Sequence, residues 1–333
     1  MTKRKGSSSS LLTLADSQLL QFVLSPFCAT IDLATLSNVC KDFQQALLSD
    51  LTAQVQWPLS VIRDWPDKRV QLVRRLTCLD LVVLRRNMLP SNLQCLTIGD
   101  QFNRPLLQLP NSIVYLRIGD SFDHTIILPP SLVFLQIGNR FNQLLRQERF
   151  GDPQLFWLPG SLTHLTLGDE FNQWLGILPP ALESLHLGRY FDQPLGELPD
   201  SLQQLTLGYY FDLPLGRLPP GLKKLTCGHN FDQELGELPG SLTHLLLGFH
   251  FRQPLGLLPA GLTHLNLNFS YRLPLGTVPP AMEELVLTSN YNYIGTVVPE
   301  NLSKIIFNAR MSDGRYLDLW CSEKQKDYPI IKF

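Results

Sequence analysis

Histidine is the residue type in this chain best suited to proton transfer or zinc binding, and four of the seven histidines occupy related positions. His164, His186, His244 and His264 each precede a leucine in a Leu-x-Leu segment, where residues that alternate with leucine face away from the core. His244 and His264 occupy the same slot 20 residues apart, so neighbouring strands would place them about 4.8 Å from each other. Because a zinc site needs more than two protein ligands, we predict no metal site here.

The sequence contains no motif for nucleophilic, phosphate-binding or metal-assisted catalysis. Gly-x-Ser-x-Gly, a Walker loop and His-Glu-x-x-His are absent, and the glycines recur at regular spacing. The six cysteines are scattered without a Cys-x-x-Cys pair, which indicates reduced packing residues: Cys28, Cys40, Cys78, Cys95, Cys227 and Cys321. We therefore predict a protein that is not an enzyme and that binds no cofactor.

The net charge argues against nucleic acid as a partner, and the short apolar runs argue against a membrane. The chain has 333 residues with 28 Lys+Arg and 29 Asp+Glu, a net charge of −1, which does not favour nucleic acid. Every apolar run is interrupted before the roughly 18 residues of a membrane span, and no small-residue cleavage site follows the basic start. We expect a soluble intracellular protein, in the cytoplasm or the nucleus, without membrane or nucleic-acid contacts.

A leucine-rich unit dominates the chain and must position the residues discussed above. The pattern Leu-x-x-Leu-x-Leu recurs every 20 residues from Leu162 onward, which is the signature of a solenoid. Its first positions are Leu93, Ile113, Leu132, Leu162, Leu182, Leu202, Leu222, Leu242, Leu262, Met282 and Leu302, with a degenerate earlier copy at Leu76.

Each unit predicts one short strand followed by a turn. The alternation in Leu-x-Leu directs leucines inward, and the strands must stack in parallel. A glycine ends five successive strands, as at Gly208, and we expect it to supply a positive φ in the turn. The aromatic residues that follow should stack as a buried spine: Phe102, Phe122, Phe141, Phe171, Phe191, Phe211, Phe231, Phe251, Tyr271 and Tyr291.

An Asn or Asp after the aromatic residue suggests a second ladder. Short polar side chains hydrogen-bond nearby backbone, and we favour this structural role over a calcium site for Asn103, Asp123, Asn142, Asn172, Asp192, Asp212, Asp232 and Asn292. The Leu-Pro pair on the return path disfavours helix, and 20 residues leave no room for one. The convex side should therefore be extended.

A helical segment is expected before the repeats. After a flexible tail at residues 1–10, residues 14–24 have helix-like apolar spacing with Asp16 suited to capping, and residues 31–48 suggest one or two further helices. Residues 51–75 should form a helical linker that caps the first unit, and residues 311–333 should cap the other end.

Residues 11–50 resemble an F-box, the motif that docks substrate receptors onto the Skp-family adaptor of cullin-RING ubiquitin ligases. The stretch Leu33-x-x-Leu36-Ser37-x-Val39-Cys40-Lys41-x-Phe43 matches the second half of the motif, whereas Leu14-Ala15 replaces its usual Leu-Pro opening and the span is slightly long. The resemblance implies adaptor contacts through Leu14, Leu19, Leu20, Val23, Leu33, Leu36, Val39 and Cys40. The alternative is a helical cap that only seals the solenoid.

The repeat units resemble the FNIP repeat, a short relative of leucine-rich repeats, over residues 76–310. Residues 162–175 contain the pattern Leu-x-x-Leu-x-Leu-Gly-x-x-Phe-Asn-Gln, with Trp174 where proline is usual. This resemblance implies a protein-interaction scaffold. One unit is longer than the others, with an insertion near residues 143–158.

The early units carry the predicted target site. Aromatic residues occupy the outward slot there, whereas later units place polar residues in it, and the insertion adds further aromatics. Aromatic and Arg side chains dominate interface energetics. We predict target binding by Tyr115, Arg117, Phe134, Phe156 and Trp157; the alternative is a solvated sheet face.

The combined prediction is an α+β protein: a small helical F-box followed by a leucine-rich-repeat-like solenoid with a parallel sheet face. Its predicted function is that of a substrate-receptor subunit of a Skp-cullin-F-box ubiquitin ligase that binds an unknown protein target through the solenoid. A repeat scaffold without a ligase link is the alternative. Bacterial effector ligases with similar 20-residue repeats form a third, but they need a large helical domain with a catalytic Cys, and about 25 residues follow Phe307.

Overall fold

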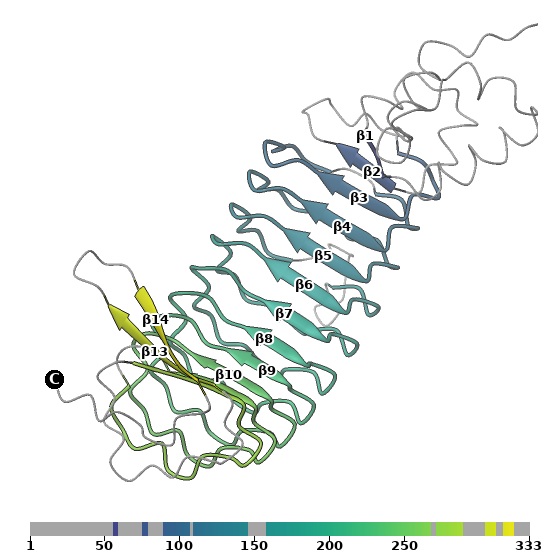
Figure 1. The fold of residues 1–333 in the computed structure, drawn as a ribbon. Helices are drawn as coiled ribbons and strands as arrows, with labels where there is room; N and C mark the ends of the chain where they lie inside the picture. The colour runs from purple at the N-terminus through teal and green to yellow at the C-terminus, as the bar shows by residue number, and fades with distance from the viewer. Residues whose placement is uncertain are drawn as a thin grey trace, which may run out of the picture.

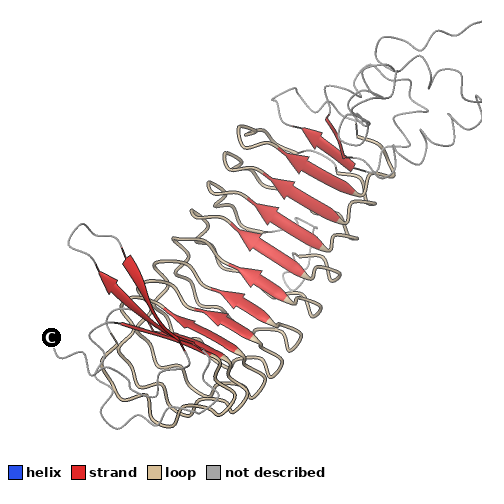
Figure 2. Cartoon of the chain, in the orientation of Figure 1, coloured by secondary structure: helices blue, strands red, loops and turns tan. Residues whose placement is uncertain are grey.

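A single ladder of strands runs the length of an elongated solenoid (Figures 1 and 2). The computed structural model describes residues 56–58, 75–78, 89–106, 109–145, 158–267, 271–288, 304–310 and 316–322. These residues form one 14-stranded sheet in which each strand neighbours the next in sequence. The strands are β1 Gln56–Pro58, β2 Arg75–Cys78, β3 Cys95–Ile98, β4 Tyr115–Ile118, β5 Phe134–Ile137, β6 His164–Leu167, β7 Ser184–His186, β8 Gln204–Thr206, β9 Lys224–Thr226, β10 His244–Leu247, β11 His264–Leu267, β12 Glu284–Thr288, β13 Lys304–Arg310 and β14 Tyr316–Ser322.

The strands from β1 to β13 pair in parallel with equivalent repeat positions aligned, as the unit predicts. Leu245, for example, is opposite Leu225 on one side and Leu265 on the other. Only β14 runs antiparallel, against β13. The register also corrects the position of the degenerate first unit. Leu76 pairs with Leu96, which is the second leucine of the unit that starts at Leu93. The degenerate unit therefore starts at Val73 and not at Leu76.

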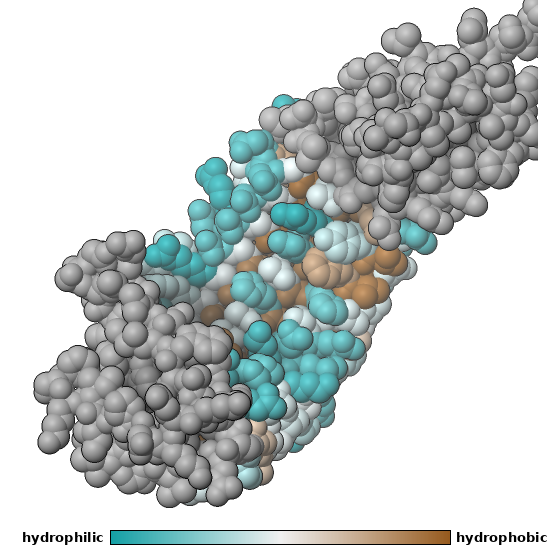
Figure 3. Space-filling view, viewed as in Figure 1, coloured by the Kyte–Doolittle hydropathy of each residue, from teal (hydrophilic) through white to brown (hydrophobic). Residues whose placement is uncertain are grey.

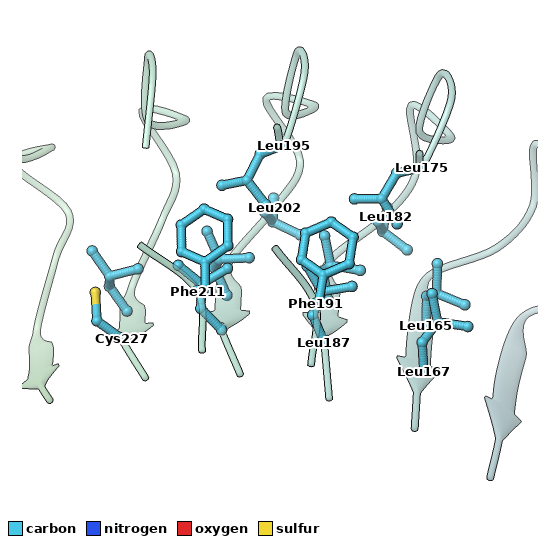
Figure 4. Close-up of a cluster of buried hydrophobic side chains, with 14 of the residues drawn as sticks. Leu165, Leu167, Leu175, Leu182, Leu187, Phe191, Leu195, Leu202, Phe211 and Cys227 are labelled. Carbon is cyan, nitrogen blue, oxygen red and sulfur yellow. The ribbon is translucent and has the colours of Figure 1, made fainter. Parts of the chain in front are cut away.

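The predicted aromatic spine is confirmed from Phe102 to Tyr271. Neighbouring rings stack with centroids 6.0–6.3 Å apart and interplanar angles of at most 15°. Phe191 and Phe211 have no exposed surface, and Figure 4 shows their rings in successive coils, surrounded by leucines such as Leu187 and Leu202. The core is therefore a continuous column with one aromatic layer per coil.

The strand-ending glycines do not have the positive φ that we expected. The glycines with φ between 65° and 71° are those on the return path: Gly176, Gly196, Gly216, Gly236, Gly256 and Gly276. At Gly208 the constraint is space, because a Cβ there would lie 1.7 Å from the carbonyl oxygen of Gly188 in the preceding coil. In the coils that carry these glycines, the backbones of successive coils approach too closely for a side chain at this position.

The polar ladder behind the spine is also confirmed. The side-chain oxygen of Asn142 accepts the backbone N–H of Asn172 at 3.0 Å, and Asn172 accepts that of Asp192 at 3.0 Å. The following glutamine often donates to the same oxygen, as Gln173 does to Asn142 at 3.1 Å. Each Asx residue thus satisfies a turn N–H of the next coil, which supports the structural role.

The predicted α+β class is wrong for the described part of the chain, which contains strands, turns and bends but no helix. The prediction rested on helices in residues 11–75; residues 11–50 lie outside the described residues, and residues 56–58 of the expected helical linker form β1. The described return paths contain no helix, as expected, and proline and a positive-φ glycine recur in them. The architecture is a parallel β-solenoid.

Candidate protein-interaction surface

The outward face of the sheet presents two rows of side chains, one on each side of the buried central leucine of each strand. The burial pattern of β4, in which buried and more exposed residues alternate, shows this arrangement. The first row contains Cys95, Tyr115, Phe134, His164, Ser184, Gln204, Lys224, His244, His264 and Glu284. Because neighbouring coils are in register, each row forms a continuous line of neighbouring side chains across the strands.

The aromatic end of the first row is a stack. The rings of Tyr115 and Phe134 lie 4.5 Å apart at 10°, and Phe134 lies 5.9 Å from the ring of His164. Tyr115 and Phe134 are both half-buried. Val133, which immediately precedes β5, is 38% exposed and adds aliphatic surface that sequence analysis did not single out. In the space-filling view, apolar residues gather over the middle of the described coils between polar margins (Figure 3).

The structure brings together part of the predicted target site. Tyr115 and Phe134 are in direct contact, and Arg117 is exposed in the second row, opposite Gln136. Phe156 and Trp157 lie outside the described residues, so their place in the site stays a prediction. The eight predicted adaptor-binding residues, from Leu14 to Cys40, also lie outside them.

The later coils carry a histidine pair in the first row. The rings of His244 and His264 stack at 4.2 Å and 7°, and each Nδ1 is hydrogen-bonded to the hydroxyl of the preceding threonine, Thr243 or Thr263, at 2.9 Å. Desolvation, then the charges of His264 and Lys224, lower the pKa of His244, while Glu283 opposes the shift. His244 is therefore disposed to stay neutral.

Three other groups on the solenoid have shifted pKa values, through burial, hydrogen bonds and nearby charges. Desolvation lowers the pKa of His186 in the second row, against the opposing charge of Asp169. Burial raises the pKa of Asp123, but hydrogen bonds from Asn142 and Gln143 outweigh it, and the carboxyl pKa lies below its ordinary value. Burial also raises the pKa of the Cys227 thiol, which makes it a packing residue.

Metal-ligating residues do not gather in the described coils. No group of three or more His, Cys, Asp or Glu side chains there could hold an ion. The described residues likewise include no helix long and apolar enough to span a bilayer.

A second exposed cluster, which sequence analysis missed, lies on the turns that follow β7 to β10. It consists of Arg189, Tyr190, Tyr209, Tyr210, His229, Phe249 and His250, which we name the turn cluster. A signal for it was present in the sequence, because the two residues between the strand-ending glycine and the spine aromatic change from Asp169-Glu170 to Arg189-Tyr190 and then Tyr209-Tyr210.

Comparison with protein families places FNIP repeats in the chain. The model described as FNIP Repeat matches residues 84–121 and 175–210. The match covers no residue before 84, so the F-box resemblance stays a prediction. A comparison with curated proteins finds no match.

Two solved structures resemble the fold. The chain is 32% identical to CroV588, described as a novel circular leucine-rich-repeat protein, with a TM-score of 0.58 over 72% of this chain and 37% of that one. It is 25% identical to YopM from Yersinia enterocolitica, with a TM-score of 0.51 over 71% of this chain and 60% of that one. The chain thus spans less than two thirds of either protein, and the likeness identifies a leucine-rich-repeat-like solenoid that contains FNIP repeats.

Proposed function

We propose that this chain is a protein-interaction scaffold that binds a protein partner through the outward face of its early coils. The observation that carries the proposal is the stack of Tyr115 on Phe134, two large rings that lie outside the buried core on a rigid sheet. Side chains of this kind offer much apolar area and lose little rotamer freedom on binding, which is why they dominate interface energetics. Arg117, which is exposed in the second row two residues after Tyr115, supplies a positive charge beside the stack.

The scaffold role agrees with the location of the contacts that stabilise a solenoid. The core leucines and the spine rings are buried within each coil and against its neighbours, so the outward rows are free to vary without loss of the fold. The change from aromatic residues in β4 and β5 to polar residues in β7 to β9 shows this variation. In this proposal the chain binds and does not catalyse.

The test measures binding and stability together. Tyr115→Ala and Phe134→Ala should each abolish capture of the cellular partner identified with the wild-type chain, while the melting temperature changes little because both side chains lie outside the core. His264→Ala, in the same row but among the later coils, is the matched control and should bind normally. Equal capture by all three variants would place the partner elsewhere and refute the proposal.

A substrate-receptor role in a Skp-cullin-F-box ligase is the second candidate function, and the motif from Leu33 to Phe43 favours it. In this role the N-terminal segment contacts the Skp-family adaptor and the solenoid presents the target. Leu20→Glu combined with Leu36→Glu should remove the adaptor and the cullin from material that co-purifies with the chain, without changing target binding. Adaptor binding that survives the double substitution would exclude this docking mode.

A further inference from the structure

We propose that the turn cluster is a second binding surface, separate from the strand face, and that it binds an acidic polypeptide segment. Its residues occupy the two slots between the strand-ending glycine and the spine aromatic in four successive coils. Tyr190, Tyr209 and Tyr210 are exposed by 45%, 36% and 39%. The tyrosine end of the cluster is thus accessible, whereas His229, Phe249 and His250 are half-buried.

The cluster is ordered by stacking along the solenoid. Arg189 lies 5.0 Å from the ring centroid of Tyr209, Tyr209 stacks on His229 at 4.3 Å, and His229 stacks on Phe249 at 4.9 Å. A second stack joins Tyr190 to Tyr210 at 5.2 Å. Contacts such as the edge-to-face pair of Tyr209 and Tyr210, at 4.8 Å and 63°, connect the two stacks.

This geometry determines which parts of the rings can meet a partner. Both faces of the His229 ring are covered by its neighbours, and Tyr209 has Arg189 on one side and His229 on the other. The surface that remains on these two residues consists of ring edges and the Tyr209 hydroxyl. Because an aromatic quadrupole makes the edge positive and the face negative, ring edges attract acceptor groups such as carboxylates.

The charge of the turn cluster also favours an acidic polypeptide. The guanidinium of Arg189 lies within 5.0–5.8 Å of three tyrosine rings, and none of the seven residues in the turn cluster is acidic. Asp212 and Asp232 of the polar ladder accept backbone N–H groups of the next coil, those of Asp232 and Arg252, so their carboxylates lie against the turn backbone.

The same two slots are acidic in the preceding coil. Asp169 and Glu170 occupy them, and Asp169 accepts the backbone N–H of Arg189 at 3.2 Å. These carboxylates would repel an acidic chain and so set the end of its footprint at Arg189.

The turn fold does not explain the aromatic residues. In early coils the first slot holds a capping side chain, such as Asp120, which accepts the N–H of Asn139 at 3.3 Å. Tyr209 cannot cap in this way, and the turn there is held by the backbone bond from the N–H of Asn230 to the carbonyl of Tyr209 at 2.9 Å. The early coil makes the same backbone bond, from the N–H of Arg140 to the carbonyl of Asp120 at 2.9 Å, so the turn is closed without any contribution from the Tyr209 ring.

The experiment selects short random peptides on the full chain and then measures the affinity of the recovered peptides by fluorescence anisotropy. The selected peptides should be enriched in Asp and Glu, and their affinity should fall as salt rises. Arg189→Glu should weaken binding by at least about tenfold, because it places a like charge against the peptide. Tyr190→Ala removes a 45% exposed side chain and should also weaken binding without lowering the melting temperature.

Two controls make the result specific. Trp174→Ala removes an aromatic residue of comparable exposure, 56%, outside the turn cluster, and should leave binding unchanged. Phe134→Ala should also leave it unchanged, so failure of this proposal is distinguishable from failure of the strand-face site. Peptides without acidic enrichment, or acidic peptides that bind Arg189→Glu and Tyr190→Ala as they bind wild type, would overturn the proposal.

Discussion

At the scale of single residues, close backbone approach explains a repeated glycine better than turn conformation does. Gly188, Gly208, Gly228 and Gly248 have φ outside the left-handed region, yet a Cβ on any of them would lie within 2.1 Å of a carbonyl oxygen of the preceding coil. That contact is backbone against backbone, so no side-chain movement can relieve it. Adjacent coils would have to separate.

Gly208→Ala should therefore destabilise the solenoid by several kcal/mol, as expected when a substitution forces overpacking into a close-packed interior. Gly240→Ala is the matched control, because a Cβ there meets nothing within 4 Å and φ is ordinary. The control should be neutral or stabilise by up to about 1 kcal/mol through the unfolded state. Chemical denaturation of the two variants checks this, and equal stabilities would contradict it.

The neutral His244 ring makes a pH-dependent contribution to stability. Its pKa in the folded chain lies below the ordinary 6.5, mainly through desolvation and then through His264 and Lys224. The unfolded chain therefore binds a proton more readily, and stability that is complete above pH 6.5 declines as the pH falls toward the folded pKa.

His244→Gln should reduce this loss. We expect the free energy of unfolding to fall less between about pH 7.5 and about pH 5.5 in the variant than in the wild type. Denaturation curves at the two pH values measure the difference. An identical fall in both proteins would show that His244 does not contribute.

At the scale of the repeated element, the Asx ladder and the aromatic spine hold successive turns together. Asn142 accepts both the backbone N–H of Asn172 and the amide of Gln173. Where the glutamine is replaced by Leu213, the corresponding bond from the Asp212 N–H to Asp192 is longer, at 3.5 Å.

Asn142→Ala should cost about 0.5–1.5 kcal/mol, the net contribution of a solvent-exposed hydrogen bond, because it removes the acceptor of the Asn172 N–H. Asn142→Asp keeps the oxygen and should retain most of the stability. Thermal unfolding compares the two variants with wild type. A carboxylate variant as unstable as the alanine variant would argue against the ladder.

The spine gives the larger effect per residue. Phe211 is fully buried between Phe191 and Phe231, so Phe211→Ala should cost about 3–5 kcal/mol through lost transfer energy and a residual cavity. Phe211→Leu should cost less, because it fills part of the cavity. A change below about 1 kcal/mol for the alanine variant would contradict a packed spine.

At the scale of the whole molecule, each coil contacts mainly its two neighbours, so the solenoid is a nearly one-dimensional assembly. The strand order follows the chain order without crossovers, and the ring stack advances by one residue per coil. The stability of such an assembly is approximately a sum of coil and interface terms.

Deletion of residues 189–208, one complete 20-residue coil, should therefore leave a folded protein. Gly188 would then precede Tyr209, and Phe171 would stack on Phe211 in place of Phe191. Deletion of residues 189–198 alone would break the register and should give aggregated material. Circular dichroism and size-exclusion chromatography distinguish the outcomes, and two equally folded deletions would refute the model of independent coils.

The sequence by itself determined the solenoid, the parallel strands, the buried spine, the Asx ladder and a return path without helix in the described coils. These features were predictable because each depends on contacts between equivalent positions about 20 residues apart, so periodicity alone places a leucine, a phenylalanine or Asn142 against its own copies. The stack of Tyr115 on Phe134 was foreseeable for the same reason.

Only the tertiary structure decided how close the coils lie and which side chains from different repeat positions come into contact. The role of Gly208 depends on a backbone separation that no pattern encodes, and the turn cluster depends on contacts between different slots, such as those of Arg189 with Tyr209 and of His229 with His250. The repeat period specifies which residues of successive coils lie next to each other along the solenoid axis. Contacts between different positions of neighbouring coils depend on how the coils pack, which only the folded chain determines.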